Sequence, residues 1–161
     1  MSWWQRQRGA LVILAITAAL VIATIWVFEV IPSRDEPGPS VTAATSTVTV
    51  GGNTVSPPTV RIDEFAGPAG TTTLSVRVAA RSDDDATSCG IFTLTEQRTG
   101  RVWGPADDAV DVSYDDHERS CEPGSTSYTI LTVFLLPADV SGDLWYDMTI
   151  DDSIVRFVIT V

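Results

Sequence analysis

The first candidate for catalysis is His117, the only histidine among 161 residues. Carboxylates and a serine are its neighbours in the segment Tyr114-Asp115-Asp116-His117-Glu118-Arg119-Ser120. Nucleophilic catalysis requires a nucleophile, a base within hydrogen-bond reach and a third group that orients the base. The segment has the composition of a polar loop and does not resemble a nucleophile elbow. We therefore interpret His117 as a solvated loop residue and predict no enzyme, with a small extracellular hydrolase as the less favoured alternative.

Clustered carboxylates are the second candidate, because calcium binds six to eight oxygen ligands. The clusters are Asp83-Asp84-Asp85, Asp107-Asp108 with Asp111, Asp115-Asp116 with Glu118, and Asp151-Asp152. None has the spacing of an EF-hand loop, so charged, solvated loops are the favoured interpretation and no cofactor is expected. The alternative is a calcium-stabilised adhesion-type domain, with a weak cation site formed by Asp83, Asp84, Asp85, Asp115 and Asp116.

Cys89 and Cys121 are the only cysteines. An even number of cysteines outside the cytoplasm favours a disulfide, and the topology argued below places both there. Free thiols or metal ligands are the alternatives, although two cysteines without paired histidines make a poor zinc site. We predict a disulfide with Cα atoms about 4.4–6.8 Å apart. It would pin down the acidic excursion (residues 96–120), which has too few large apolar residues to be held by burial alone.

Tryptophan side chains are the remaining candidates for binding. Trp103 follows a turn-forming segment, and Trp145 is out of phase with the apolar residues of its strand. Large aromatic residues at a surface often mark contacts with a partner. Trp103 and Trp145 are therefore candidate ligand-binding residues, with packing in the core as the alternative.

An apolar run near the N-terminus predicts a membrane anchor. Of the 22 residues in Ala10–Ile31, 19 are apolar, and about 20 such residues in a helix cross a hydrocarbon core of about 30 Å. Arg6 and Arg8 precede the run and acidic residues follow it, which places residues 1–9 in the cytoplasm. The run is too long for a signal peptide and lacks a small-x-small cleavage site. We predict an uncleaved, single-pass transmembrane helix over residues 10–30, in contact with the lipid bilayer of the cell membrane.

Small residues recur every fourth position within this run, at Ala15, Ala19 and Ala23. Such spacing lets two helices approach closely, so a homodimer through this stripe is an alternative to simple alanine richness.

Residues 31–58 predict a tether rich in proline, threonine and serine, because this composition supports neither a helix nor a core. The alternation at Val48 and Val50 leaves open a first edge strand. Residues 59–161 then show a period of two, with Leu144 to Ile150 and Val155 to Val161 as the clearest examples, joined by a short turn at Asp151-Asp152-Ser153. Six to eight short strands of this kind predict an all-β domain, an antiparallel β-sandwich.

Two further strands have distinctive patterns. Tyr128–Leu136 is apolar at nearly every position from Ile130 onward, which predicts a central strand buried on both faces. Cys89–Thr95 predicts another strand, with a bulge at Gly90 because the alternation slips there.

The charge of the outer region excludes one class of partner. Residues 35–161 contain 20 acidic residues and 7 arginines, for a net charge of −13. This charge aids solubility and repels phosphate backbones, so no nucleic-acid binding is expected.

Several short segments resemble a known family. They are TTTLSVRVAARSDD, CGIFTLTEQRTGRVW, CEPGSTSYTILTVFLLPAD and LWYDM, in that order after an anchor and a tether. The pattern is similar to actinobacterial membrane-anchored ectodomains of unknown function that resemble mycobacterial immunoprotective extracellular antigens. Its marks are Arg98-Thr99-Gly100 before Trp103, and the turn Pro123-Gly124 before a strand ending in Phe134-Leu135-Leu136-Pro137.

The resemblance covers residues 60–161 and implies an immunoglobulin-like β-sandwich without established catalytic residues. Together with the anchor, it leads us to expect a non-enzymatic binding or assembly module outside the cytoplasm. Its ligand would be an unknown protein or envelope component.

Overall fold

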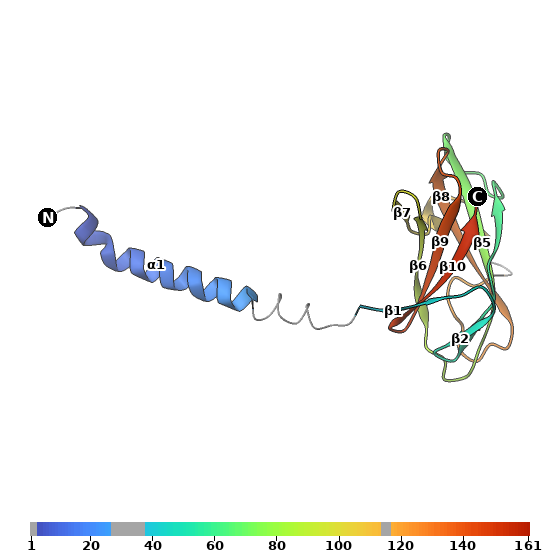
Figure 1. Ribbon diagram of the computed structural model, residues 1–161, viewed down its shortest axis with the longest axis horizontal. Helices are drawn as coiled ribbons and strands as arrows, with labels where there is room; N and C mark the ends of the chain where they lie inside the picture. Colours follow the sequence, from blue (N-terminus) through green and yellow to red (C-terminus); the bar gives the residue numbers. More distant parts are fainter. Residues whose placement is uncertain (1–2, 27–37, 114–116) are drawn as a thin grey trace. The chain divides into compact units, whose positions relative to one another are not determined.

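The computed structural model describes residues 3–26, 38–113 and 117–161. The chain divides into two units, Met1–Gly38 and Pro39–Val161, and each is described by itself (Figure 1).

The first unit contains helix α1 (Trp3–Ile25). The hydroxyls of Thr17 and Thr24 donate to the carbonyls of Ile13 and Leu20, at 2.8 and 2.7 Å, which is how threonine satisfies its hydroxyl inside an apolar helix. The sequence predicts a transmembrane helix over residues 10–30, of which 27–30 lie outside the described residues. Within the described part of the chain, no helix is both long and apolar enough to cross a membrane.

The second unit consists of two packed β-sheets, which confirms the β-sandwich prediction at this level. Sheet A contains, from edge to edge, β1 (Ser40–Ala43), β10 (Ser153–Thr160), β9 (Asp143–Ile150), β6 (Cys89–Glu96) and β7 (Val102–Trp103). Sheet B contains β2 (Val48–Val50), β3 (Asn53–Val55), β4 (Thr59–Ile62), β5 (Thr71–Ser82) and β8 (Tyr128–Pro137).

The order of sheet B follows from its central strand, β5. Strands β3 and β4 pair in succession along one edge of β5, and β8 pairs along the other edge. Pro57 and Pro58 separate β3 from β4 because proline has no N–H to contribute to the ladder.

The inner faces of the sheets form one apolar core. Leu74, Val76 and Val78 of β5 face Tyr146 and Met148 of β9, and all five are fully buried. The ring of Tyr146 stacks on Phe92 and meets Phe134 edge-on. Its hydroxyl shares a 3.1 Å hydrogen bond with that of Thr132, and burial raises the pKa of Tyr146. The period-two pattern thus identified the core residues of β9 and β10 correctly.

Two local predictions are confirmed. Strand β6 shows a register shift between Cys89 and Phe92, which is the bulge expected at Gly90. Strands β9 and β10 form a hairpin whose turn is Asp151-Asp152, with Asp151 in the left-handed region (φ 53°) that aspartate tolerates better than most residues.

The predicted tether of residues 31–58 is wrong over residues 40–55, which form β1, β2 and β3. Strand β1 pairs in parallel with β10, and β3 pairs with β5. Asn53 and Val55 are fully buried. Valine and threonine offer few large apolar groups for a core, but as β-branched residues they favour strands. Backbone hydrogen bonds with β10 and β5 then hold β1 and β3 in the sheets. The alternative of an edge strand at Val48 and Val50 is confirmed.

Strand β8 is buried on both faces, as predicted, but it is not central. Among the described strands it pairs with β5 alone, and its outer face and free edge are covered by the excursion. Val110, from the loop after the short 3-10 helix η2 (Asp107–Ala109), packs on Leu131 and Val133 of β8. Ala106 donates to the Val133 carbonyl at 2.8 Å. The excursion is therefore held by burial as well as by the disulfide.

Candidate functional site

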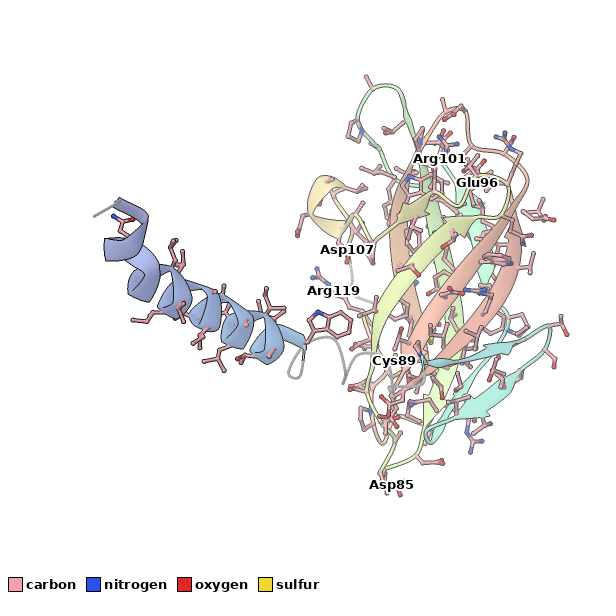
Figure 2. The ribbon with its side chains drawn as sticks, turned by 60° about the vertical axis from the view of Figure 1, so that its left-hand side comes forward. Asp85, Cys89, Glu96, Arg101, Asp107 and Arg119 are labelled. Carbon is pink, nitrogen blue, oxygen red and sulfur yellow. A yellow bond between two sulfur atoms is a disulfide. The ribbon has the colours of Figure 1, made fainter. Side chains whose placement is uncertain are left out.

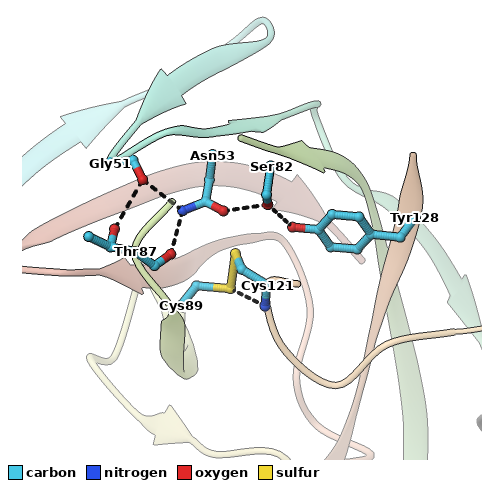
Figure 3. Close-up of a disulfide and its surroundings, with 7 residues drawn as sticks. All are labelled: Gly51, Asn53, Ser82, Thr87, Cys89, Cys121 and Tyr128. Carbon is cyan, nitrogen blue, oxygen red and sulfur yellow. Dashed lines mark hydrogen bonds between the residues drawn. A yellow bond between two sulfur atoms is a disulfide. The ribbon is translucent and has the colours of Figure 1, made fainter. Parts of the chain in front are cut away.

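The predicted disulfide joins Cys89 at the start of β6 to Cys121, with Cα atoms 5.1 Å apart (Figure 3). The backbone N–H of Cys121 donates to the sulfur of Cys89 at 2.7 Å. Beside the bridge, the side chain of Asn53 donates to the carbonyls of Gly51 and Thr87.

The carbonyl oxygen of the Asn53 side chain accepts from Ser82 at 2.6 Å, and the hydroxyl of Ser82 is also bonded to that of Tyr128. Asn53 is thus satisfied by the protein itself. This region joins both sheets to the loop after β5 and is structural.

Among the residues that the structure describes, the acidic side chains do not converge on a cation site. Asp83 makes an exposed ion pair with Arg81 at 3.9 Å, and its carbonyl accepts from Ala86 and Gly124 as a turn requires. Within the described residues, no group of three or more metal-ligating side chains is arranged to hold an ion. Asp115 and Asp116 lie outside the described residues.

His117 lies half-buried in the loop before Cys121. It makes no hydrogen bond or ion pair with residues that the structure describes. The neighbouring carbonyl and amide of Glu118 pair with β8, through Leu131 and Thr129. The loop around His117 therefore serves as a cover for the edge of β8.

A buried carboxylate, which the sequence analysis did not single out, closes one end of the sandwich. Glu96 is fully buried at the end of β6 and accepts hydrogen bonds from Arg98 at 3.2 Å, from Arg101 at 2.9 Å and from Thr99. These hydrogen bonds, with that of Arg101 the largest influence, lower the pKa of Glu96. Figure 2 shows Glu96 and Arg101 together at this end and Asp85 at the other.

The surroundings of Glu96 indicate a structural role. Arg101 also pairs with Asp139 at 3.1 Å and lies over the ring of Trp103. The group holds the turn between β6 and β7, where Gly100 adopts a positive φ of 73°. An open depression lies beside it, lined by Gln97, Arg98, Ser141, Gly142 and Asp143.

Trp103 and Trp145 lie on opposite faces of sheet A, so they do not form one binding patch. Trp103 is opposite Leu94 and packs against the core, whereas Trp145 is opposite Thr95 on the outer face. The reason is the register of the turn between β6 and β7, which aligns Trp103 with an inward residue. Of the two tryptophans, Trp145 is therefore the one that a partner could contact on the outer face of sheet A.

The outer face of sheet A centres on an ordered stack. The Arg156 guanidinium lies over the Trp145 ring, 4.4 Å from its centroid. Arg156 also donates two hydrogen bonds of 2.7 Å to Asp147, the residue directly opposite. This paired geometry holds the guanidinium in place and raises the pKa of Arg156. The two charges neutralise each other where they are partly shielded from water.

Uncharged side chains surround the stack. Val158 and Thr95 flank Trp145 in one row across the sheet, and Val102 extends that row onto β7. Ile154 and Val41 are paired neighbours further along β10 and β1. The outward residues of this face are thus mainly valine, isoleucine and threonine.

Sheet B differs because the chain covers its outer face. Val110 and Phe65 pack over β8. Glu64 forms ion pairs with Arg77, at 2.5 Å, and with Arg61 over β5 and β4. The described residues provide no such cover for sheet A. Its outer face, centred on Trp145 and Arg156, is the best candidate for a functional surface.

In comparisons with known proteins, the chain matches no protein-family model and no curated protein.

Proposed function

We propose that this protein is a non-enzymatic binding or assembly module, held outside the cytoplasm by an N-terminal membrane anchor and acting through the outer face of sheet A. The observation that carries the proposal is the face around Trp145, which the described residues leave uncovered, on a domain whose net charge is strongly negative. Most side chains of this face are uncharged, and its central charges, Arg156 and Asp147, are paired with each other. Exposed apolar surface without a covering segment is typical of a protein contact surface.

The membrane anchor rests on the sequence. Nineteen apolar residues in the 22 of Ala10–Ile31, basic residues before them and acidic residues after them support a single-pass protein with its N-terminus in the cytoplasm. The disulfide agrees with this assignment, because such bonds persist mainly in oxidising compartments.

An immunoglobulin-like arrangement is part of the proposal. Two packed sheets, with a short first strand that pairs in parallel with the last strand, support it. So does the resemblance of residues 60–161 to the actinobacterial ectodomains, whose partners would then be protein or envelope components.

Cysteine labelling on intact cells tests the location. Both native cysteines are bonded, so Ile62→Cys, at an exposed position of β4 in sheet B, supplies a single free thiol. Gln5→Cys supplies a matched thiol on the other side of the anchor. A membrane-impermeant maleimide should label the Ile62→Cys protein before lysis and the Gln5→Cys protein only after lysis. Labelling of the Ile62→Cys protein only after lysis would overturn the proposal.

A further inference from the structure

We infer that the outer face of sheet A binds a second copy of this chain, in a two-fold symmetric, face-to-face dimer. The inference rests on the proposed function, because it names the partner of the same surface. Three properties of this face support it: the position of its exposed apolar residues, its charge and its area.

Exposed apolar side chains are concentrated on sheet A. In the described part of residues 39–161, five large apolar residues are exposed, and four of them belong to sheet A strands: Val41 (50%), Ile91 (67%), Val102 (59%) and Val158 (58%). The fifth, Ile62 (53%), is on β4 of sheet B. Ile91, Val102 and Val158 each adjoin a residue that belongs to the core or packs against it, as alternation along a strand requires. Val41 lies on β1, whose four residues are all exposed.

The charge of the face suits a copy of itself. In a two-fold interface the same patch meets itself, so an unpaired charge near the axis would face its own like charge. Arg156 and Asp147 avoid this because they are paired within one chain. Asp143 is the other outward carboxylate on these strands; it lies at the end of the face, where its oxygen accepts from Thr160 at 2.7 Å.

The acidity of the remaining surface makes other contacts between copies unfavourable. Residues 35–161 have a net charge of −13, and like charges brought together at an interface cost several kcal/mol. A face whose central charges are paired, with Asp143 only at its end, is therefore the surface on which two copies approach with the least repulsion.

The area of the face sets the expected strength. Strands about 4.8 Å apart and about 27 Å long, with both edge strands short, give about 500 Å² per copy. The total of about 1,000 Å² is at the lower limit for a specific interface, whereas stable complexes bury about 1,600 Å². The dimer should accordingly be weak in dilute solution and favoured when anchors confine the copies to one membrane.

Sedimentation equilibrium of the full-length protein in detergent micelles tests the inference. The unmodified chain should show a reversible monomer–dimer equilibrium. Val158→Asp places a new carboxylate of each copy on the face and should raise the dissociation constant by about tenfold or more. Ile62→Asp adds the same charge at a site of similar exposure on sheet B and should leave the constant within about twofold.

A monomer at every concentration would overturn the inference. Equal effects of Val158→Asp and Ile62→Asp would also overturn it, and would place self-association elsewhere, such as the stripe of Ala15, Ala19 and Ala23. Failure of the proposed function is separate, because it appears as labelling of the Ile62→Cys protein, whose thiol lies outside the dimer face, only after lysis.

Discussion

Glu64 shows how individual charged residues of this domain are used. Its carboxylate accepts hydrogen bonds from Arg77 and Ser75 on the outer face of sheet B. The hydrogen bond from Arg77 is the main reason that the pKa of Glu64 falls from 4.5 to about 2. Glu96 and Asp147 are likewise paired with arginine. At this scale the charged groups with defined partners hold strands and turns together.

Replacing Glu64 should make the free energy of unfolding depend less on pH in the acidic range. Because the folded pKa is about 2 and the ordinary value is 4.5, the carboxylate stabilises the fold fully above about pH 5 and loses this effect as the pH falls toward 2. Glu64→Gln should lower the free energy of unfolding by about 1–3 kcal/mol at pH 7, and the difference should vanish near pH 2. Urea denaturation at both pH values measures it.

The exposed Glu122→Gln variant removes the same charge and serves as the control. An equal loss of stability in both variants would show that net charge, and not the contact with Arg77, is responsible.

Removing the disulfide should loosen the excursion first. The Cys89→Ala, Cys121→Ala double variant opens a link between residues separated by 32 positions and should lower the free energy of unfolding by about 2–5 kcal/mol. Val110 keeps its contact with β8, so the folded state should persist with faster hydrogen exchange in residues 104–113. An unchanged denaturation midpoint would contradict the prediction, as would equal acceleration of exchange throughout both sheets.

At the scale of elements, the cover over β8 is the most informative feature. A ten-residue apolar strand at the end of a sheet invites pairing with another chain. Here its edge bonds to the backbone of Ala106 and Glu118, and its outer face packs against Val110. The acidic excursion thus shields the edge and the outer face of β8 from solvent and from pairing with another chain, although the excursion itself is mostly polar.

Truncating Val110 should weaken this cover. Val110 is 6% exposed, so Val110→Ala should cost about 1.5–3 kcal/mol of unfolding free energy from lost burial and the cavity left behind. Urea denaturation measures the loss, and light scattering at elevated temperature should show earlier aggregation. The half-buried Val112→Ala variant should lose clearly less; equal losses would contradict a specific role for Val110.

At the scale of the whole molecule, the excess of negative charge opposes compaction. Residues 35–161 have a net charge of −13. Salt also weakens ion pairs, but most of those in the described residues join positions close in the sequence. Raising sodium chloride from about 10 to about 150 mM shortens the screening length from about 30 to about 8 Å. The thermal midpoint of the disulfide-bonded protein should therefore rise, as calorimetry measures.

Calcium chloride at matched ionic strength separates screening from binding. Equal midpoints in the two salts are expected if the acidic loops are solvated. A higher midpoint in calcium, reversed by chelator, would instead support the calcium-stabilised adhesion-type domain.

Local alternation was enough to predict much of this domain. Large apolar side chains recur at every second position over residues 144–150 and 155–161, and a two-sheet fold is the simplest way to bury the face that they share. The bulge at Gly90 and the turn at Asp151-Asp152 also follow from a slip in the pattern and from turn-forming residue types. The disulfide prediction required only two cysteines and the expectation, from the sequence, that both lie outside the cytoplasm.

Contacts between distant segments required the tertiary structure. Pairing of β1 with β10 joins residues 113 positions apart, and short Val/Thr strands become stable only through such pairing. The side on which Trp103 lies depends on the register of β6 and β7, and a shift of one residue would reverse it. Sequence periodicity describes which residues of a strand share a face. Packing decides which of those faces the chain then covers. Within the described residues of the second unit, it leaves the outer face of sheet A uncovered around Trp145 and Arg156.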